Sequence, residues 1–444
     1  MMMFDMRRSV AATLAALLAV LALATSALAE VKIQKVTSPK GVRAWLVEDY
    51  TVPIISIRLA FRGGSTQDPA GKEGLANLMT GLFDEGAGEM DSDAFQLALD
   101  DAGAEMSFSA GSDGIFGAMR MLADNQTQAF SLLRQAILSP RFDQAPIDRI
   151  RAQIAAGIEA SARDPGQMSQ VAWREAIYAG HPYSRPGEGT LESLAAITRD
   201  DLVSFHKRQF ARDNLFVGVV GAISAEELKA RLDQLFGDLP EKAEMAKIDR
   251  ATPKLGQEIR VDYDLPQTSI YLSWAGIQRD DPEFFAAYLM NHILGGGTFS
   301  SRLFTEIREK RGLAYGVDSA LVNRDFDSSL QISTATRADR ATETLSIIRA
   351  EAKRMAEAGP TPEELDFAKK YVIGAYAINN LDSSAAIART LVQLQMDDLG
   401  IDYIQRRVEQ IDAVTLDQVK AAAKRLLNPE PAVMLVGPVA KAAQ

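Results

Sequence analysis

Apolar and polar residues alternate in two stretches of the chain that lie far apart but resemble each other. The stretches read VPIISIRLAFRGGS (Val52–Ser65) and LPQTSIYLSWAGIQ (Leu265–Gln278), and their prolines, Pro53 and Pro266, are 213 positions apart. Alternation with a period of two is typical of a strand that buries one face. We therefore expect one strand at the same place in each half of a duplicated chain.

A segment that combines a helix with a strand repeats at a similar spacing. In Ala196–Gly221 and Ala413–Pro438, a threonine precedes an amphipathic helix, and a turn containing Asn or Pro leads to an apolar strand. Thr198 and Thr415 suit the N-cap position, because a threonine hydroxyl accepts a hydrogen bond from the first helical turn. The strands are predicted at Leu215–Val220 and Ala432–Val436.

These repeats predict an α+β protein of two homologous domains, each a mostly antiparallel sheet with helices packed on one face. The polar segment Leu239–Gln257 contains two prolines and little periodicity, so the join should lie there. We expect an N-terminal domain at 30–245, a linker at 246–257 and a C-terminal domain at 258–444. Two similar halves joined by a linker also predict a cleft between them.

The first 29 residues have the pattern of a signal peptide. Arg7 and Arg8 precede the apolar run Val10–Ala24, and the sequence Ala27-Leu28-Ala29 forms an A-x-A cleavage site. The alternative is a retained membrane anchor, because the apolar stretch approaches spanning length. The small residues at the cleavage site favour removal after Ala29 and a periplasmic or secreted protein.

Composition narrows the classes of function. The 444 residues carry a formal net charge of −11, which argues against a nucleic-acid-binding protein and against attraction to anionic membranes. The chain has no cysteine, so thiolate metal sites and cysteine nucleophiles are excluded. A core of this size needs no disulfides, so the lack of cysteine is compatible with export.

The stretch GKEGLANLMTGLFDEGAG (Gly71–Gly88) predicts a short amphipathic helix. Its apolar residues are Leu75, Leu78, Met79 and Leu82, at the spacing i, i+3, i+4, i+7. The positions between them are Asn77, Thr80 and Gly81. None of these three residues is a strong acid, a base or a metal ligand.

The segment Asn291–Leu321 begins with a helix that three glycines interrupt. Ser300 or Ser301 can cap the next helix, which should end near Gly312. The glycines could cradle a phosphate, but no G-K-[ST] or GxGxxG context follows. Arg308 and Tyr315, near the junction of this helix with a strand, could be ordinary surface residues on composition alone.

The chain resembles the pitrilysin/insulinase-like zinc peptidases, the inverzincins, and in particular their processing-peptidase-like bacterial branch. The resemblance is carried by GGSTQDPAGKEGLA, by HPYSRPGEGTLESLAAIT (His181–Thr198) and by LGGGTFSSRLFTEIREKRGLAY. Members of this family bind zinc with an inverted H-x-x-E-H motif on the helix after GLA. Two imidazoles at i and i+4 reach one Zn²⁺, the glutamate polarises the metal-bound water, and a further glutamate downstream completes the coordination.

Aligned with this motif, the chain has lost its zinc chemistry. Asn77 and Gly81 occupy the two histidine positions, and Thr80 occupies the position of the glutamate. The downstream ligand would fall near Ala156–Gly157, and Glu159, the nearest carboxylate, is out of register. The resemblance therefore implies a member that lacks H-x-x-E-H and binds no metal.

No other group in the sequence replaces the missing catalyst. The chain has three histidines, and each stands without a partner at metal-binding spacing, so we interpret them as structural: His181, His206 and His292. Carboxylates without imidazole make a weak zinc site, which applies to Glu73, Asp84 and Glu85. Asp91–Asp93 suggests a helix N-cap and Gly111–Gly114 a turn. No calcium loop or serine elbow is present.

The C-terminal half keeps the residue pair that the family uses on its substrate, although the N-terminal half lacks the zinc ligands. The resemblance implies that Arg308 and Tyr315 reach the substrate at the zinc site. Tyr315 would donate to the carbonyl that becomes an oxyanion, and Arg308 would hold a neighbouring main-chain carbonyl. Such a pair has no use without a metal opposite it, so we expect the zinc in a partner subunit.

The leading hypothesis is the non-metal-binding subunit of a heterodimeric periplasmic zinc endopeptidase, inactive alone. Its partner would be a homologous subunit that carries H-x-x-E-H. An extended peptide substrate would add as a strand to a sheet edge of the partner's N-terminal domain. The alternatives are an inert scaffold and a homodimeric peptide-binding protein of the same fold.

Overall fold

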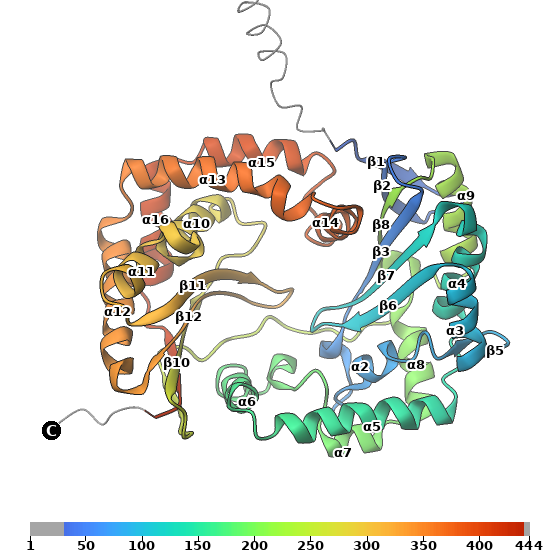
Figure 1. Ribbon diagram of the computed structural model, residues 1–444, viewed down its shortest axis with the longest axis horizontal. Helices are drawn as coiled ribbons and strands as arrows, with labels where there is room; N and C mark the ends of the chain where they lie inside the picture. Colours follow the sequence, from blue (N-terminus) through green and yellow to red (C-terminus); the bar gives the residue numbers. More distant parts are fainter. Residues whose placement is uncertain (1–30, 439–444) are drawn as a thin grey trace, which may run out of the picture.

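The computed structural model describes residues 31–438, and its N-terminal half is built on a six-stranded sheet (Figure 1). The strands stand in the order β1-β2-β8-β3-β7-β6. Their bounds are β1 Gln34–Thr37, β2 Arg43–Glu48, β3 Ile54–Arg62, β6 Ala104–Ala110, β7 Gly114–Leu122 and β8 Leu215–Gly221. The short strands β4 (Gly86–Ala87) and β5 (Met90–Asp91) form a separate antiparallel pair.

The C-terminal half is built on a five-stranded sheet in the order β11-β12-β10-β13-β9. Its strands are β9 Glu258–Val261, β10 Gln267–Ala275, β11 Ala314–Asn323, β12 Ser328–Arg337 and β13 Ala432–Val436. This order repeats β6-β7-β3-β8-β2 of the first sheet. In both sheets one strand pair, β2 with β8 and β13 with β9, is parallel and the other neighbours are antiparallel. The predicted α+β fold with duplicated, mostly antiparallel halves is confirmed.

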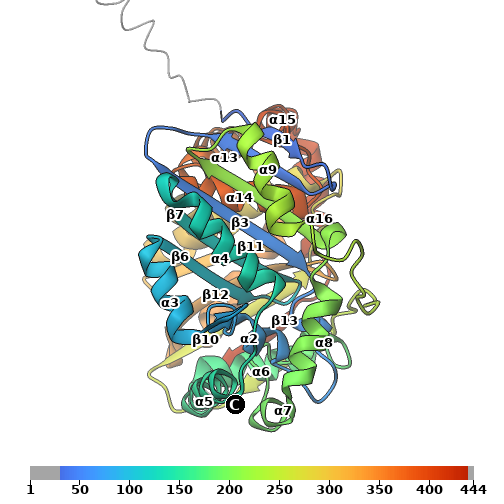
Figure 2. The ribbon, with the colours of Figure 1, turned by 90° about the vertical axis from the view of Figure 1, so that its right-hand side faces the viewer.

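Helices cover the outer face of each sheet and bury its apolar side chains. Figure 2 shows those of the N-terminal half: α3 (Ser92–Asp101), α4 (Gln126–Leu138), α8 (Arg199–Gln209) and α9 (Ala225–Phe236). In the C-terminal half, α10 (Phe284–Asn291), α12 (Ala341–Ala358) and α16 (Leu416–Leu427) do the same. Each half therefore has its own hydrophobic core.

The two repeated threonines cap the helices that the sequence assigns to them. Thr198 begins α8 and forms a capping box with Asp201, and Thr415 begins α16 and forms one with Gln418. The Asp91 side chain likewise caps α3 by accepting from the Ala94 N–H at 3.0 Å. Each cap satisfies backbone donors that the helix leaves unpaired and is worth about 1 kcal/mol.

Each half also sends one helix across to the other half. The helix α14 (Ser384–Met396) packs against β3 and β8 of the N-terminal sheet, and α6 (Pro165–Ile177) packs against β9 and β13 of the C-terminal sheet (Figure 1). Gly218 on β8 permits the close approach, because a Cβ there would lie 2.5 Å from the Ala388 carbonyl oxygen. The prediction of helices on one face was thus incomplete, because both sheets also receive a helix on their inner face.

The remaining helices complete the walls of the molecule: α2 Leu75–Thr80, α5 Gln144–Ser161, α7 Leu191–Ala196, α11 Arg302–Phe304, α13 Pro362–Asn380 and α15 Tyr403–Asp412. Residues 237–257, around the predicted linker, contain neither helix nor strand. The domain boundaries stay a prediction, and the predicted signal peptide lies outside the described residues. Within 31–438 we find no helix with the length and apolar character needed to span a bilayer.

Candidate functional site

The helix at the position of the family's zinc motif is α2, and a buried carboxylate holds its start. The two carboxylate oxygens of Asp68 accept from the backbone N–H groups of Gly74 and Ala76, both at 2.9 Å. Burial raises the pKa of Asp68 to about 7. Gly74 has a φ of 94°, which favours glycine, so the turn before α2 depends on both residues.

The end of α2 leaves little room at the place where a second histidine would stand. Leu75, Leu78 and Met79 are buried in the core as predicted, but the helix stops at Thr80, whose hydroxyl donates to the Asn77 carbonyl at 2.9 Å. A Cβ on the next residue, Gly81, would lie 3.0 Å from a methyl carbon of Ile150. Ile150 belongs to α5, which packs beside α2.

The residues around α2 do not fit a zinc ion. Gly157 lies on α5 with open space around the position of its missing Cβ, and no carboxylate replaces it. Glu159 is exposed and lies two residues after Gly157, so its side chain points about 200° away from position 157 around the helix axis. Across residues 31–438, no group of three or more histidines, aspartates and glutamates could hold a metal ion.

The three histidines pack as structural residues. His206 donates from Nε2 to the Ile137 carbonyl at 2.8 Å, and burial lowers its pKa to about 4. His181 accepts from the Tyr183 N–H at Nδ1, so its Nε2 donates to the Asp249 carbonyl at 3.0 Å. The His292 ring stacks on Tyr371 with centroids 5.0 Å apart, and burial lowers the pKa of His292.

Arg308 and Tyr315 lie side by side on the C-terminal half. Ser301 caps α11, and the chain continues through a π-helical turn, Thr305–Glu309, that carries Arg308. Tyr315 stands at an irregularity near the start of β11, where the register with β12 shifts between Ala314 and Val317. The guanidinium carbon of Arg308 is 4.5 Å from the centre of the Tyr315 ring.

The polar ends of this pair are free to bind a ligand. The Tyr315 residue is 86% exposed. Within the described part of the chain, neither its hydroxyl nor the Arg308 guanidinium has a hydrogen bond or an ion pair. The neighbouring cations are engaged, because Lys310 and Arg311 each donate to Glu306 at 2.6 Å and lower the pKa of that carboxyl to about 2.

Packing accounts for the three glycines before this site. A π-helical turn, His292–Gly296, follows α10 and lies against β11. A Cβ on Gly295 would lie 2.6 Å from the Ser319 hydroxyl, one on Gly296 would lie 2.7 Å from the Asn291 side chain, and one on Gly297 would lie 2.8 Å from the His292 carbonyl oxygen. The helical segment therefore runs into the glycines and ends there, at Gly296, as expected for glycines that interrupt a helix.

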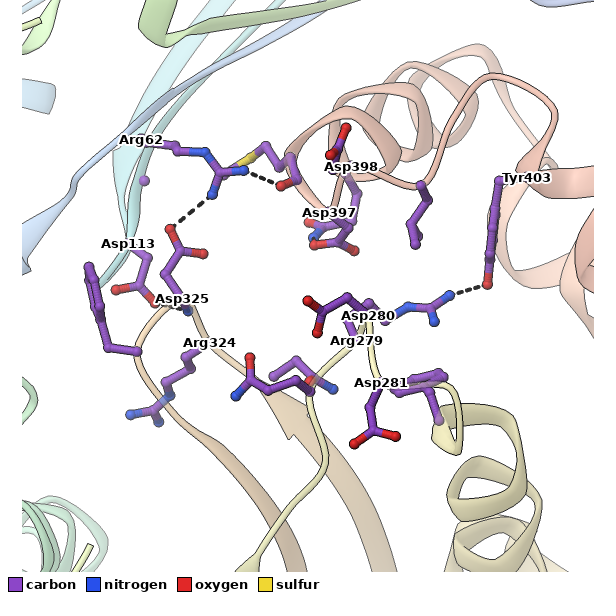
Figure 3. A pocket seen from close by; sticks show the side chains of 18 of the residues that line it. Arg62, Asp113, Arg279, Asp280, Asp281, Arg324, Asp325, Asp397, Asp398 and Tyr403 are labelled. Atoms are coloured by element: carbon purple, nitrogen blue, oxygen red, sulfur yellow. Dashed lines mark hydrogen bonds and ion pairs between the residues drawn. The ribbon is translucent and has the colours of Figure 1, made fainter. Parts of the chain in front are cut away.

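A cleft of about 940 Å³ between the halves brings together charged residues that the sequence separates widely (Figure 3). Arg62 pairs with Asp325 at 3.0 Å. Asp113, in the predicted turn Gly111–Gly114, accepts from the Tyr183 hydroxyl at 2.7 Å and from the Asp325 N–H at 3.3 Å. No local pattern in the sequence marks these bonds, which tie the β11–β12 hairpin to the N-terminal half.

Comparison with known proteins agrees with this architecture. Residues 43–191 match the family model described as insulinase (peptidase family M16), and residues 196–372 match the model described as peptidase M16 inactive domain. The crystal structure of a peptidase M16 inactive domain from Pseudomonas fluorescens is 31% identical, with a TM-score of 0.85, over 93% of this chain and 99% of that one.

More distant relatives carry differing names. A Helicobacter pylori protein named non-peptidase homolog YmxG is 24% identical over 84% of this chain and 86% of its own length. An uncharacterized zinc protease of Mycobacterium leprae is 27% identical over 91% of this chain and 92% of its own. The periplasmic protease PqqL of Escherichia coli shares the fold, with a TM-score of 0.78 and 17% identity over 91% of this chain and 45% of that one. The chain belongs to the peptidase M16 (insulinase) family, as a member without the metal-binding residues.

Proposed function

We propose that this chain is the non-metal-binding subunit of a heterodimeric zinc endopeptidase. The observation that carries the proposal is the exposed Tyr315 beside Arg308, on a chain whose α2 offers no zinc ligand. A tyrosine hydroxyl can donate to the oxyanion of a tetrahedral intermediate, and a guanidinium can hold a main-chain carbonyl. Both roles require a metal-activated water supplied from elsewhere.

In this proposal the zinc belongs to a homologous partner that carries H-x-x-E-H. The two subunits enclose a chamber, and an extended peptide adds to a sheet edge of the partner's N-terminal domain. The signal-peptide pattern supports a periplasmic location, and so does the name of the related periplasmic protease PqqL. The domain boundaries at 30–245, 246–257 and 258–444 are part of the same proposal.

A second candidate is an inert scaffold or a homodimeric peptide-binding protein. The name of the Helicobacter pylori relative, a non-peptidase homolog, favours it. Against it stands the Arg308–Tyr315 pair, since neither polar end contributes a hydrogen bond to the fold of the described residues. An aromatic ring that served only in packing would be expected to be buried, whereas Tyr315 is exposed.

The experiment compares the chain alone, the H-x-x-E-H partner alone and the mixture. Zinc content and cleavage of a fluorogenic peptide are measured for each. We expect zinc only where the partner is present and strong cleavage only in the mixture. Zinc-dependent cleavage by the isolated chain, or a mixture no more active than the partner alone, would overturn the proposal.

A further inference from the structure

A second cavity, of about 380 Å³, lies between α6 and the inner face of the C-terminal sheet. This volume is within the range of small-ligand sites. Helix α6 contributes Ser169, Gln170, Trp173 and Arg174, and the sheet contributes side chains of β10, β11, β12 and β13. Because α6 comes from the N-terminal half, the cavity exists only through the exchange of helices between the halves.

Arg174 brings an unpaired positive charge to this cavity. Its Nε is shielded from solvent and has no hydrogen-bond partner. In the part of the chain that the structure covers, its guanidinium makes neither a hydrogen bond nor an ion pair. A shielded donor of this kind is unfavourable unless a ligand satisfies it, and the natural ligand of a guanidinium is an oxyanion.

Arg324, at the tip of the β11–β12 hairpin, brings a second positive charge without an ion-pair partner to this cavity. Its guanidinium carbon lies 5.0 Å from the ring centre of Tyr183, and it forms no ion pair among residues 31–438. The nearby carboxylates of Asp113 and Asp327 accept instead from the hydroxyls of Tyr183 and Tyr178. In Figure 3 the Arg324 side chain points away from the aspartates of the interdomain cleft.

Asp318 and Gln331 add acceptor oxygens to the cavity. Asp318 on β11 stands opposite Ser333 on β12, and its carboxylate has no hydrogen bond or ion pair in the described chain. A carboxylate in the wall disfavours a dianion such as phosphate. The cavity suits a ligand that has one negatively charged end and N–H groups next to it. The Asp318 carboxylate and the Gln331 amide oxygen can accept hydrogen bonds from those N–H groups.

Aromatic and aliphatic side chains form the rest of the wall. Trp173 faces the cavity from α6, and Tyr271 and Met434, which are paired across β10 and β13, face it from the sheet. Such a surface can bury one apolar side chain of a ligand. The wall therefore offers a place for a side chain next to the places for a carboxylate and for N–H groups.

We propose that this cavity binds the free C-terminal end of a peptide. Arg174 and Arg324 hold the α-carboxylate, Asp318 and Gln331 accept from the adjacent N–H groups, and Trp173 and Tyr271 contact the terminal side chain. Asp318 is three residues beyond Tyr315 on β11, about 10 Å along the strand. The proposal deepens the proposed function and rests on it only in taking the ligand to be a peptide.

The test is a binding measurement on the chain alone, without partner or zinc. Calorimetry compares one peptide with a free carboxylate, the same peptide amidated, an amidated peptide ending in Glu, and the N-acetylated terminal amino acid. We expect the free acid to bind at least about tenfold more tightly than the other three, because only it combines the carboxylate with the preceding N–H groups. Equal affinity for acid and amide, or for the Glu-ending amide or the acetyl amino acid, would overturn the proposal.

Arg174→Gln should lower the affinity for the free acid towards that of the amide, since only Arg324 then remains to hold the carboxylate. Arg349→Gln, which removes an exposed arginine on α12, is the matched control and should change nothing. An unaltered affinity in the folded Arg174→Gln protein would overturn the proposal. The peptide comparison uses the unaltered chain, so the test does not depend on how the variant folds. If the isolated chain does not prefer the free acid, the heterodimer can still cleave peptides. The binding test and the cleavage test can therefore fail independently.

Discussion

The half-buried Arg308 lies against the exposed Tyr315, with the guanidinium carbon 4.5 Å from the centre of the tyrosine ring. The contact joins a π-helical turn to the irregular start of β11. A cation over an aromatic face is favourable by about 0.5–1 kcal/mol at an exposed site, which helps to order both side chains before a ligand arrives. The polar ends of the pair are thus available to a ligand, while the described residues of the N-terminal half contain no group that could hold a metal ion.

Replacing the tyrosine hydroxyl should slow the heterodimer without weakening its assembly. For Tyr315→Phe we expect kcat to fall by about 10²–10³, the usual effect of removing one oxyanion donor. Arg308→Ala should mainly raise KM, since it removes a contact to a main-chain carbonyl. Kinetics on the mixture with the H-x-x-E-H partner measure both effects.

The control for this comparison is Tyr50→Phe, which alters another exposed tyrosine in the N-terminal half. It should leave kcat and KM unchanged. Full activity of the double variant Arg308→Ala/Tyr315→Phe would show that the pair has no part in catalysis.

Restoring the motif residues alone should not restore zinc binding. In the variant Asn77→His/Thr80→Glu/Gly81→His, the second imidazole would start 3.0 Å from an Ile150 methyl, just beyond the end of α2. The fourth ligand would also be missing. We expect less than one zinc per chain by elemental analysis after dialysis.

Two further substitutions in this triple variant give a second protein whose zinc content can be compared with the first. Adding Ile150→Ala and Gly157→Glu removes the obstruction and supplies a carboxylate on α5, so zinc occupancy should rise. Stoichiometric zinc in the first variant would contradict the structural explanation of the loss.

A side chain at Gly218 should loosen the contact between the halves. A Cβ there would lie 2.5 Å from the Ala388 carbonyl oxygen and 2.9 Å from the Leu391 Cβ, so α14 must move in Gly218→Val. We expect a loss of about 1–3 kcal/mol in the free energy of unfolding and a larger radius of gyration in solution scattering. Gly157→Ala, with open space around its Cβ, should instead be neutral or slightly stabilising. Equal behaviour of the two variants would argue against a tight α14–β8 contact.

His206 should make the protein less stable in acid. Its pKa is about 4 in the folded chain and 6.5 when exposed, so the unfolded state binds more protons between these values. The free energy of unfolding should therefore fall as the pH drops from 6.5 towards 4, by at most about 1.4 kcal/mol per pH unit from this group. Chemical denaturation at several pH values measures the slope.

Asp68 acts in the opposite direction throughout this range. Its pKa is raised from 3.8 to about 7, so its contribution to stability is present at low pH and is lost as the pH rises through that window. The comparison of wild type with His206→Gln isolates the histidine, because Asp68 is common to both. An identical slope in the two proteins would exclude His206 as the cause.

The sequence by itself determined the features that depend on neighbouring residues. Period-two alternation located β3 and β10, and Thr198 and Thr415 could be identified as caps because a cap bonds to a backbone group three residues away. The missing zinc ligands and the Arg308–Tyr315 pair could be identified only through the resemblance to the family, because the residues by themselves also fit an ordinary helix and an ordinary surface.

Only the tertiary structure decided what depends on distant contacts. The bond from Tyr183 to Asp113 spans 70 residues, and the one from Asp325 to Asp113 spans 212. The exchange of α6 and α14, and the cavity at Arg174, likewise arise where one half packs on the other. Local patterns record which face of an element is apolar but not which distant element covers it, because burial is non-directional and any apolar partner of suitable shape satisfies it.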